Sequence, residues 1–222
     1  MPILAVAIVV LFIVVVVRAW SSRAKLARQL RDAPASTIAA LPEGESARVV
    51  GTVVGEATLI APLTGRRCVA YVAQVEQRVS TGKTTYWKGL IDEVRHHPFT
   101  IDDGTGKAII DPGQAKLLIE MDSTSRSGTF DDATPAESEF LARHQIDSKG
   151  WFLNKSLRYL EGVIEPGERV AVLGRAVREP DPEAARDATG YRDALPTRVR
   201  IGGSKDQPIL VSDRKDLTRA RG

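Results

Sequence analysis

The chain has 222 residues, 43% hydrophobic and 27% charged, a composition typical of a folded protein. Cys68 is its only cysteine and it has three histidines, which excludes an internal disulfide and a cysteine-rich zinc module. The net charge of +3 is unevenly placed: residues 1–32 hold five basic side chains and one acidic one, so the remainder is close to neutral. A nucleic-acid-binding domain would spread basic charge over its surface, so nucleic acid is not an expected partner.

Residues 1–20 are predicted to form a transmembrane helix. No charged side chain occurs from Met1 to Val17, and the run to residue 20 gives about 20 residues, or roughly 30 Å of helix. Arg18 would extend toward the lipid headgroups, and Trp20 has the position of an interfacial aromatic residue. The alternatives are a buried core helix and a cleaved signal peptide, which would place basic residues before the apolar run.

The basic residues that follow the apolar run predict its orientation. Lys and Arg favour the cytoplasmic flank of a span, which indicates a single-pass protein of the cell membrane with its N-terminus outside and the rest cytoplasmic. Residues 21–34 are expected to form a basic juxtamembrane helix that ends at Pro34. The residues expected at the interface with the lipid bilayer are Arg18, Trp20, Arg23, Lys25 and Arg28. The alternative is that these charges only fix the topology.

Residues 40–212 are expected to form a mainly β domain, in which short runs rich in β-branched residues alternate with turn signals. The expected strands lie at residues 48–54, 67–79, 84–95, 99–101, 107–111, 114–121, 157–164, 169–178, 198–201 and 208–212. The second and third of these form a long hairpin around a turn at residues 80–83. The spacing predicts an α+β fold built on an antiparallel barrel-like domain, of which an OB-like barrel is one form.

One helix is expected within this β domain. Thr134 can cap a helix, Pro135 suits its first position and Glu137 completes a capping box, so a helix should run from there to about Gln145. The polar stretch before it, Ser123–Asp132, is expected to be a loop, and residues 123–133 a possible internal boundary. Residues 213–222 are expected to form a polar tail.

An ordered set of motifs resembles a known family. The set consists of Gly51–Val53, Ala61–Tyr71, Phe99–Gly106 with Asp111–Pro112, Arg158–Glu168 and Val170–Gly174. Together they resemble the membrane-adjacent GIDE/MULAN-type domain, which occurs in a mitochondrial E3 ubiquitin ligase family and in many prokaryotic membrane proteins. The resemblance covers roughly residues 40–212.

This resemblance implies a role in binding a protein partner. Ligases of the family carry a RING finger built from Cys and His zinc ligands and a second span, and this sequence has neither pattern. The expected partner is therefore an unidentified membrane or cytoplasmic protein. The first alternative is an accessory role in a ubiquitin-ligase-like or membrane-stress pathway, beside a separate enzyme.

The partner-binding residues are predicted to be Tyr86, Trp87, Arg66 and Arg67, because aromatic and arginine side chains on an exposed hairpin are common interface anchors. The alternative for Trp87 is packing on the domain's own core.

A second alternative is an enzyme that the motifs do not reveal. Cys68 could act as a nucleophile with His96 or His97 as its base, although its apolar neighbours favour a buried structural role. Three carboxylates could form an acid–base pair, or could simply be solvated at a hairpin end: Glu161, Glu165 and Glu168.

No cofactor or metal site is predicted. Gly82-Lys83-Thr84 resembles the end of a phosphate-binding loop but lacks the earlier glycine of that motif. Asp102-Asp103-Gly104 lacks the ligand spacing of a calcium loop and favours a turn.

Overall fold

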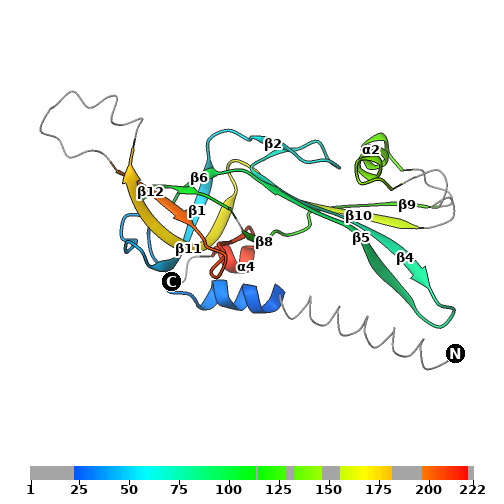
Figure 1. Cartoon of the computed structure of the whole chain (residues 1–222), viewed down its shortest axis with the longest axis horizontal. Helices are drawn as coiled ribbons and strands as arrows, with labels where there is room; N and C mark the ends of the chain where they lie inside the picture. Colours follow the sequence, from blue (N-terminus) through cyan, green and yellow to red (C-terminus); the bar gives the residue numbers. More distant parts are fainter. Residues whose placement is uncertain (1–22, 114, 129–132, 147–155, 182–196, 220–222) are drawn as a thin grey trace, which may run out of the picture.

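The computed structural model describes residues 23–113, 115–128, 133–146, 156–181 and 197–219. It confirms the mainly β class: the described residues form a barrel at one end of an elongated molecule and a separate four-stranded sheet that extends from it (Figure 1).

The barrel consists of five strands that close on themselves. Its strands, in spatial order, are β1 (Ser46–Val54), β6 (Phe99–Asp102), β7 (Lys107–Ile110), β12 (Thr197–Gly202) and β11 (Arg169–Pro180), and β11 pairs again with β1. Two short strands, β13 (Leu210–Ser212) and β8 (Lys116–Leu118), continue from β11. Five strands closed in this order form an OB-like barrel.

The predicted antiparallel, barrel-like domain is present as a closed barrel, but one of its strand pairs is not antiparallel. β7 and β12 are parallel. Parallel neighbours need a long crossover connection, and here the chain leaves the barrel after β7, builds part of the second sheet and passes through β11 before it returns as β12. The strand expected over residues 114–121 is also shorter, since only Lys116–Leu118 pairs with β13.

The second sheet is built from two insertions into the barrel. Its order is β5 (Thr85–His96), β4 (Ala70–Ser80), β10 (Leu157–Ile164) and β9 (Ser123–Ser127), all antiparallel. The predicted hairpin is present as β4 and β5, with a bulge between Val75 and Glu76. A small arm, β2 (Leu59–Ile60) paired with β3 (Arg67–Cys68), precedes β4.

The prediction of a loop over Ser123–Asp132 was wrong for the first half of that range, which forms the edge strand β9. The strand carries no apolar residue, so its sequence gave no strand signal. Two serines on the side that faces α2 have polar partners: Ser125 donates to Glu137, and Ser127 lies 3.2 Å from the hydroxyl of Tyr159.

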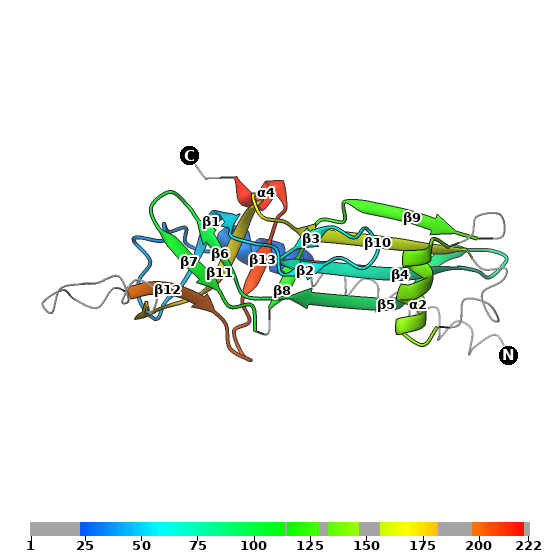
Figure 2. The same cartoon turned by 90° about the horizontal axis from the view of Figure 1, so that it is seen from above.

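Helix α2 (Pro135–Arg143) covers one face of the four-stranded sheet (Figure 2). The predicted capping box is present, since Thr134 accepts from the Glu137 amide at 3.3 Å and Glu137 accepts from the Thr134 amide at 2.7 Å. The end of the helix is held by Glu93 of β5, which accepts from Arg143 at 2.9 Å and lies 2.8 Å from His144.

A helix over residues 23–32 lies against the barrel and ends before Pro34. Its apolar side packs through Ala27 and Leu30 against Leu173, Leu210 and Leu217. The predicted span at residues 1–20, with Arg18 and Trp20, lies outside the described residues. Within the described ranges, no helix is both long and apolar enough to cross a membrane.

The expectation of a polar tail at residues 213–222 was wrong for its described part. Helix α4 (Lys215–Thr218) buries Leu217 beside the helix of residues 23–32. Arg48 of β1 donates to the carbonyl oxygens of Leu217 at 2.7 Å and of Arg219 at 3.1 Å. Burial of Leu217 and the hydrogen bonds from Arg48 therefore help to hold a segment whose composition is mostly charged.

Candidate functional site

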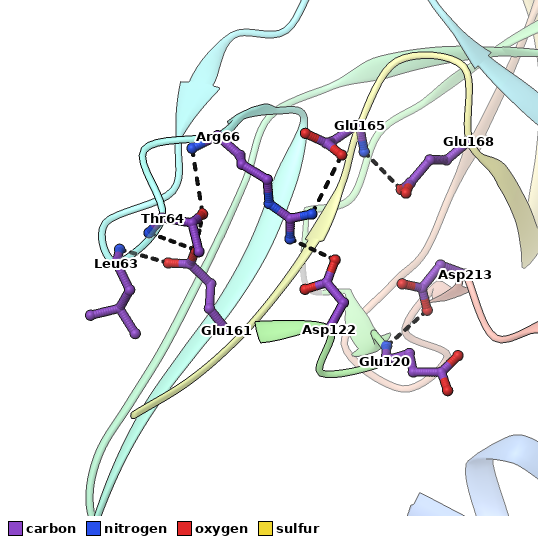
Figure 3. A network of polar contacts seen from close by, with 9 residues as sticks. All are labelled: Leu63, Thr64, Arg66, Glu120, Asp122, Glu161, Glu165, Glu168 and Asp213. Carbon is purple, nitrogen blue, oxygen red and sulfur yellow. Dashed lines mark hydrogen bonds and ion pairs between the residues drawn. The ribbon is translucent and has the colours of Figure 1, made fainter. Parts of the chain in front are cut away.

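A buried carboxylate, Glu161, organises the junction between the barrel and the sheet (Figure 3). Glu161 lies on β10 and is fully buried. It accepts from the amides of Leu63 at 2.7 Å and Thr64 at 3.0 Å, and from the Thr64 hydroxyl. The expectation that it is solvated at a hairpin end was therefore wrong: its oxygens hold the loop that joins β2 to β3.

Arg66, from the same loop, lies between two acidic side chains. It donates to Asp122 at 2.6 Å and lies 3.5 Å from Glu165, at the turn between β10 and β11 (Figure 3). Its guanidinium group is therefore occupied within the chain, which favours a structural role over the predicted role in partner binding.

Two further carboxyl groups of the junction are partly buried. Glu168 accepts from the Glu165 amide at 2.9 Å, and Asp213 accepts from the Glu120 amide at 2.9 Å. Burial raises the pKa of Asp213 to about 6, and the nearby charges of Glu168 and Glu120 add to the effect. Burial also raises the pKa of Glu168.

Asp213→Asn is expected to stabilise the protein at neutral pH. Because the folded-state pKa of Asp213 is raised, the folded protein favours the protonated, uncharged carboxyl group. The contribution of Asp213 to stability is therefore fully present below about pH 4 and is lost as the pH rises through the folded-state pKa and the carboxyl group ionises. Asparagine keeps an acceptor for the Glu120 amide and carries no charge. We expect a gain of about 1–2 kcal/mol in unfolding free energy at pH 7, allowing for solvent screening, and none near pH 4.

Urea denaturation of the full chain in mild detergent, repeated from about pH 4 to pH 7, measures this difference. Asp206→Asn, at an exposed position, is the matched control. A gain for Asp213→Asn that does not change with pH would contradict the prediction.

Cys68 is fully buried in β3. Burial raises the pKa of its thiol to about 11, with further contributions from Glu161 and Glu165. A nucleophilic cysteine needs a thiolate, so this environment argues against the enzyme hypothesis based on Cys68. Of its two candidate bases, His96 has a pKa lowered by burial, and the Nδ1 atom of His97 lies 3.2 Å from the Thr58 hydroxyl.

Asp102, the last residue of β6, and Asp103 after it shape a turn, as the sequence predicts. Asp103 accepts from the amides of Thr105 at 2.9 Å and Gly106 at 3.1 Å, and Gly104 adopts a positive φ of 84°. In the part of the chain that the structure describes, no three His, Cys, Asp or Glu side chains are grouped to hold a metal ion.

The four predicted partner-binding residues lie in two separate places. Arg66 and Arg67 precede β4 near the barrel, whereas Tyr86 lies opposite Val79 near the far end of that strand. The intervening part of β4 separates the two pairs by roughly 30 Å. They do not form one patch.

Trp87 instead belongs to a group of arginines that the sequence did not reveal. The guanidinium carbon of Arg158 lies 4.5 Å from the ring centre and that of Arg126 lies 5.9 Å away. Arg78 is the cross-strand partner of Trp87, and Arg158 also pairs with Glu76. We call Arg78, Trp87, Arg126 and Arg158 the arginine–tryptophan cluster. These residues could have been grouped in advance only from the register in which their strands pair.

The cluster lies on the face of the sheet opposite α2. Cross-strand partners share a face, and the alternation places Tyr71, Val75 and Tyr159 toward the helix and the cluster away from it. Trp87 is half-buried among its arginines and outside the apolar cores of the described residues. An open groove of about 500 Å³ lies beside it, lined by Arg78, Arg126 and the neighbouring Ser127, Gly128 and Ser156.

The fold defines a class of β-rich protein in which an OB-like barrel carries an inserted sheet, with hydrogen bonds and ion pairs at the junction between them. Residues 70–191, more than half of the chain, match the family model GIDE, described as E3 ubiquitin ligase. The chain therefore belongs to the GIDE family, as the motifs predict. No significant match is found among curated proteins or solved structures.

Proposed function

We propose that this GIDE-family chain is a single-pass membrane protein whose β-rich domain binds a protein partner beside the membrane. The apolar run from Met1 to Val17, followed by basic residues, supports an anchor with the N-terminus outside the cell membrane and the domain in the cytoplasm. Membership of a family described as ubiquitin ligases supports a role in protein recognition.

The observation that carries the binding role is the exposed tip of the β2–β3 arm. Ile60 is 69% exposed, more than any other large apolar side chain in the described residues, and its cross-strand partner is the exposed Arg67. An apolar side chain beside an arginine is typical of an interface anchor. Since Glu161 fixes the adjoining loop, the arm is ordered before a partner arrives, which lowers the entropy lost on binding.

The test is site-specific photo-crosslinking of the full chain in its own membranes. A photoreactive residue at Ile60 is expected to capture one stoichiometric protein, and Arg67→Glu to abolish the capture. A photoreactive residue at Val177, an exposed apolar position on the barrel, is the matched control and is expected to capture none. Equal capture at both positions, or none at Ile60, would refute binding at this arm.

The family description favours a second candidate, an accessory role beside a separate ubiquitin-type ligase. In that case the protein captured at Ile60 is expected to be a ligase or a ligase substrate. Conjugates on that protein should then fall when the chain is deleted and return with the parent chain, but not with Arg67→Glu. Unchanged conjugation would rule out this candidate and leave the binding role intact.

A further inference from the structure

The uncovered face of the four-stranded sheet lies on the same side of the molecule as the helix of residues 23–32. Figure 1 shows α2 above the sheet and this helix beneath the barrel, and Figure 2 shows α2 in front of the sheet and the helix behind the barrel. Near the barrel, Ile119 and Glu120 cover the face opposite α2 at Gly162, whereas no element of the described ranges covers it around Trp87. The two surfaces can therefore face one common plane.

The sheet contributes positive charge and an aromatic ring to this side. Arg78 and Arg126 are exposed, and neither forms an ion pair with another described residue. Arg158 is balanced by Glu76, so the cluster keeps an excess of two positive charges. Asp92 lies farther along the same face and accepts from Gln74 at 3.0 Å.

The helix contributes more positive charge to the same side. Because Ala27 and Leu30 pack on the barrel, the exposed Lys25 and Arg28 lie on the part of the helix that faces away from it. Arg31, one turn after Ala27, lies on the flank of the helix near α4 and pairs there with Asp216 at 2.7 Å. Basic side chains at both ends of the molecule thus point away from α2.

We propose that the arginine–tryptophan cluster docks on the anionic lipid headgroups of the membrane that anchors the chain. This inference rests on the proposed anchor, which would hold the face close to a bilayer. Charge complementarity and an interfacial tryptophan are the features of a headgroup contact. The basic residues are spread from the helix to the far end of the sheet, and an extended bilayer surface can meet both, whereas a short acidic peptide would reach only one.

The experiment measures the distance between Trp87 and lipid in the reconstituted full chain. Trp87 is made the single tryptophan by Trp20→Phe and Trp151→Phe, and the chain is placed in bilayer discs that contain headgroup spin-labelled lipid. With about one third phosphatidylserine, we expect quenching of Trp87 fluorescence to be at least about twofold stronger than in phosphatidylcholine alone. About 0.5 M salt should remove the difference, because it screens exposed charges.

Matched variants locate the contact on one face. Arg78→Gln with Arg126→Gln is expected to reduce quenching in anionic discs to the level in neutral discs. Lys88→Gln with Arg95→Gln removes the same charge from the opposite face of the same hairpin and should leave quenching unchanged. Circular dichroism checks that each variant is folded. If the arginine variant is not folded, the salt dependence of Trp87 quenching in the parent chain still tests the docking.

The possible failures are distinguishable. A chain that high salt strips from the discs would disprove the anchor itself. A chain that stays anchored but shows equal quenching in both lipids would overturn the docking proposal alone. Loss of a crosslinked acidic protein from the arginine variant, with lipid quenching unchanged, would also overturn it and would assign the face to a protein.

Discussion

Glu161→Ala is expected to destabilise the full chain by about 3 kcal/mol or more, a large share of the stability of an ordinary domain. The Leu63 amide, the Thr64 amide and the Thr64 hydroxyl all lose their acceptor at once. Glu161 is fully buried and these hydrogen bonds are part-buried, so water can replace the lost acceptor only in part. Urea denaturation in mild detergent, followed by circular dichroism, measures the effect.

Glu165→Ala is the matched control, because Glu165 is partly exposed and its ion pair with Arg66 is long, at 3.5 Å. We expect a loss of no more than about 1 kcal/mol there. Glu161→Gln should fall between the two, since its amide oxygen can still accept from part of the loop. The prediction fails if Glu161→Ala and Glu165→Ala cost the same. A loosened loop should also weaken crosslinking from Ile60, which connects this prediction to the binding arm.

Gly162→Ala is the second substitution with a large expected effect. An added Cβ would overlap the carbonyl oxygen of Glu120 and lie 2.8 Å from the Cγ2 atom of Ile119. Its nearest neighbour is backbone of the junction, which cannot rotate away as a side chain would. We expect a loss of about 2–4 kcal/mol in unfolding free energy.

Gly89→Ala provides the control on the edge strand of the same sheet. An added Cβ there meets nothing within 4 Å, and the backbone does not adopt a positive φ. The expected change is within about 0.5 kcal/mol. Thermal unfolding of the two variants, measured side by side in the same detergent, tests the contrast. Similar melting temperatures would show that the junction backbone is softer than its geometry indicates.

Local sequence signals predicted the elements of this fold well. The capping box at Thr134 and Glu137 predicted the start of α2. The Pro166-Gly167 turn predicted where β10 ends and where β11 begins. These signals are short-range, because each depends on side chains that bond their own backbone or on a glycine that tolerates a positive φ.

Long-range features were not predictable in the same way. Alternation shows that a segment is a strand but not which strand it joins, so the split into a barrel and a separate sheet was missed. Glu161 follows Arg158 and Tyr159 in a sequence typical of a half-exposed strand, and only the loop from Leu63 explains its burial. Arg126 and Trp87 are far apart in the sequence and meet only through the pairing of β9, β10, β4 and β5.

The interleaving of the two sheets has a consequence for how the chain folds. The β4–β5 hairpin is local and can form early, but Leu157–Ile164 must cross most of the domain to pair with Ala70–Gln77. The barrel needs β11 and β12 from the later part of the chain, and the sheet needs β10 from the same part. A cut near residues 123–133 would leave neither fragment with a complete sheet, so each sheet is completed only when both halves of the chain are present.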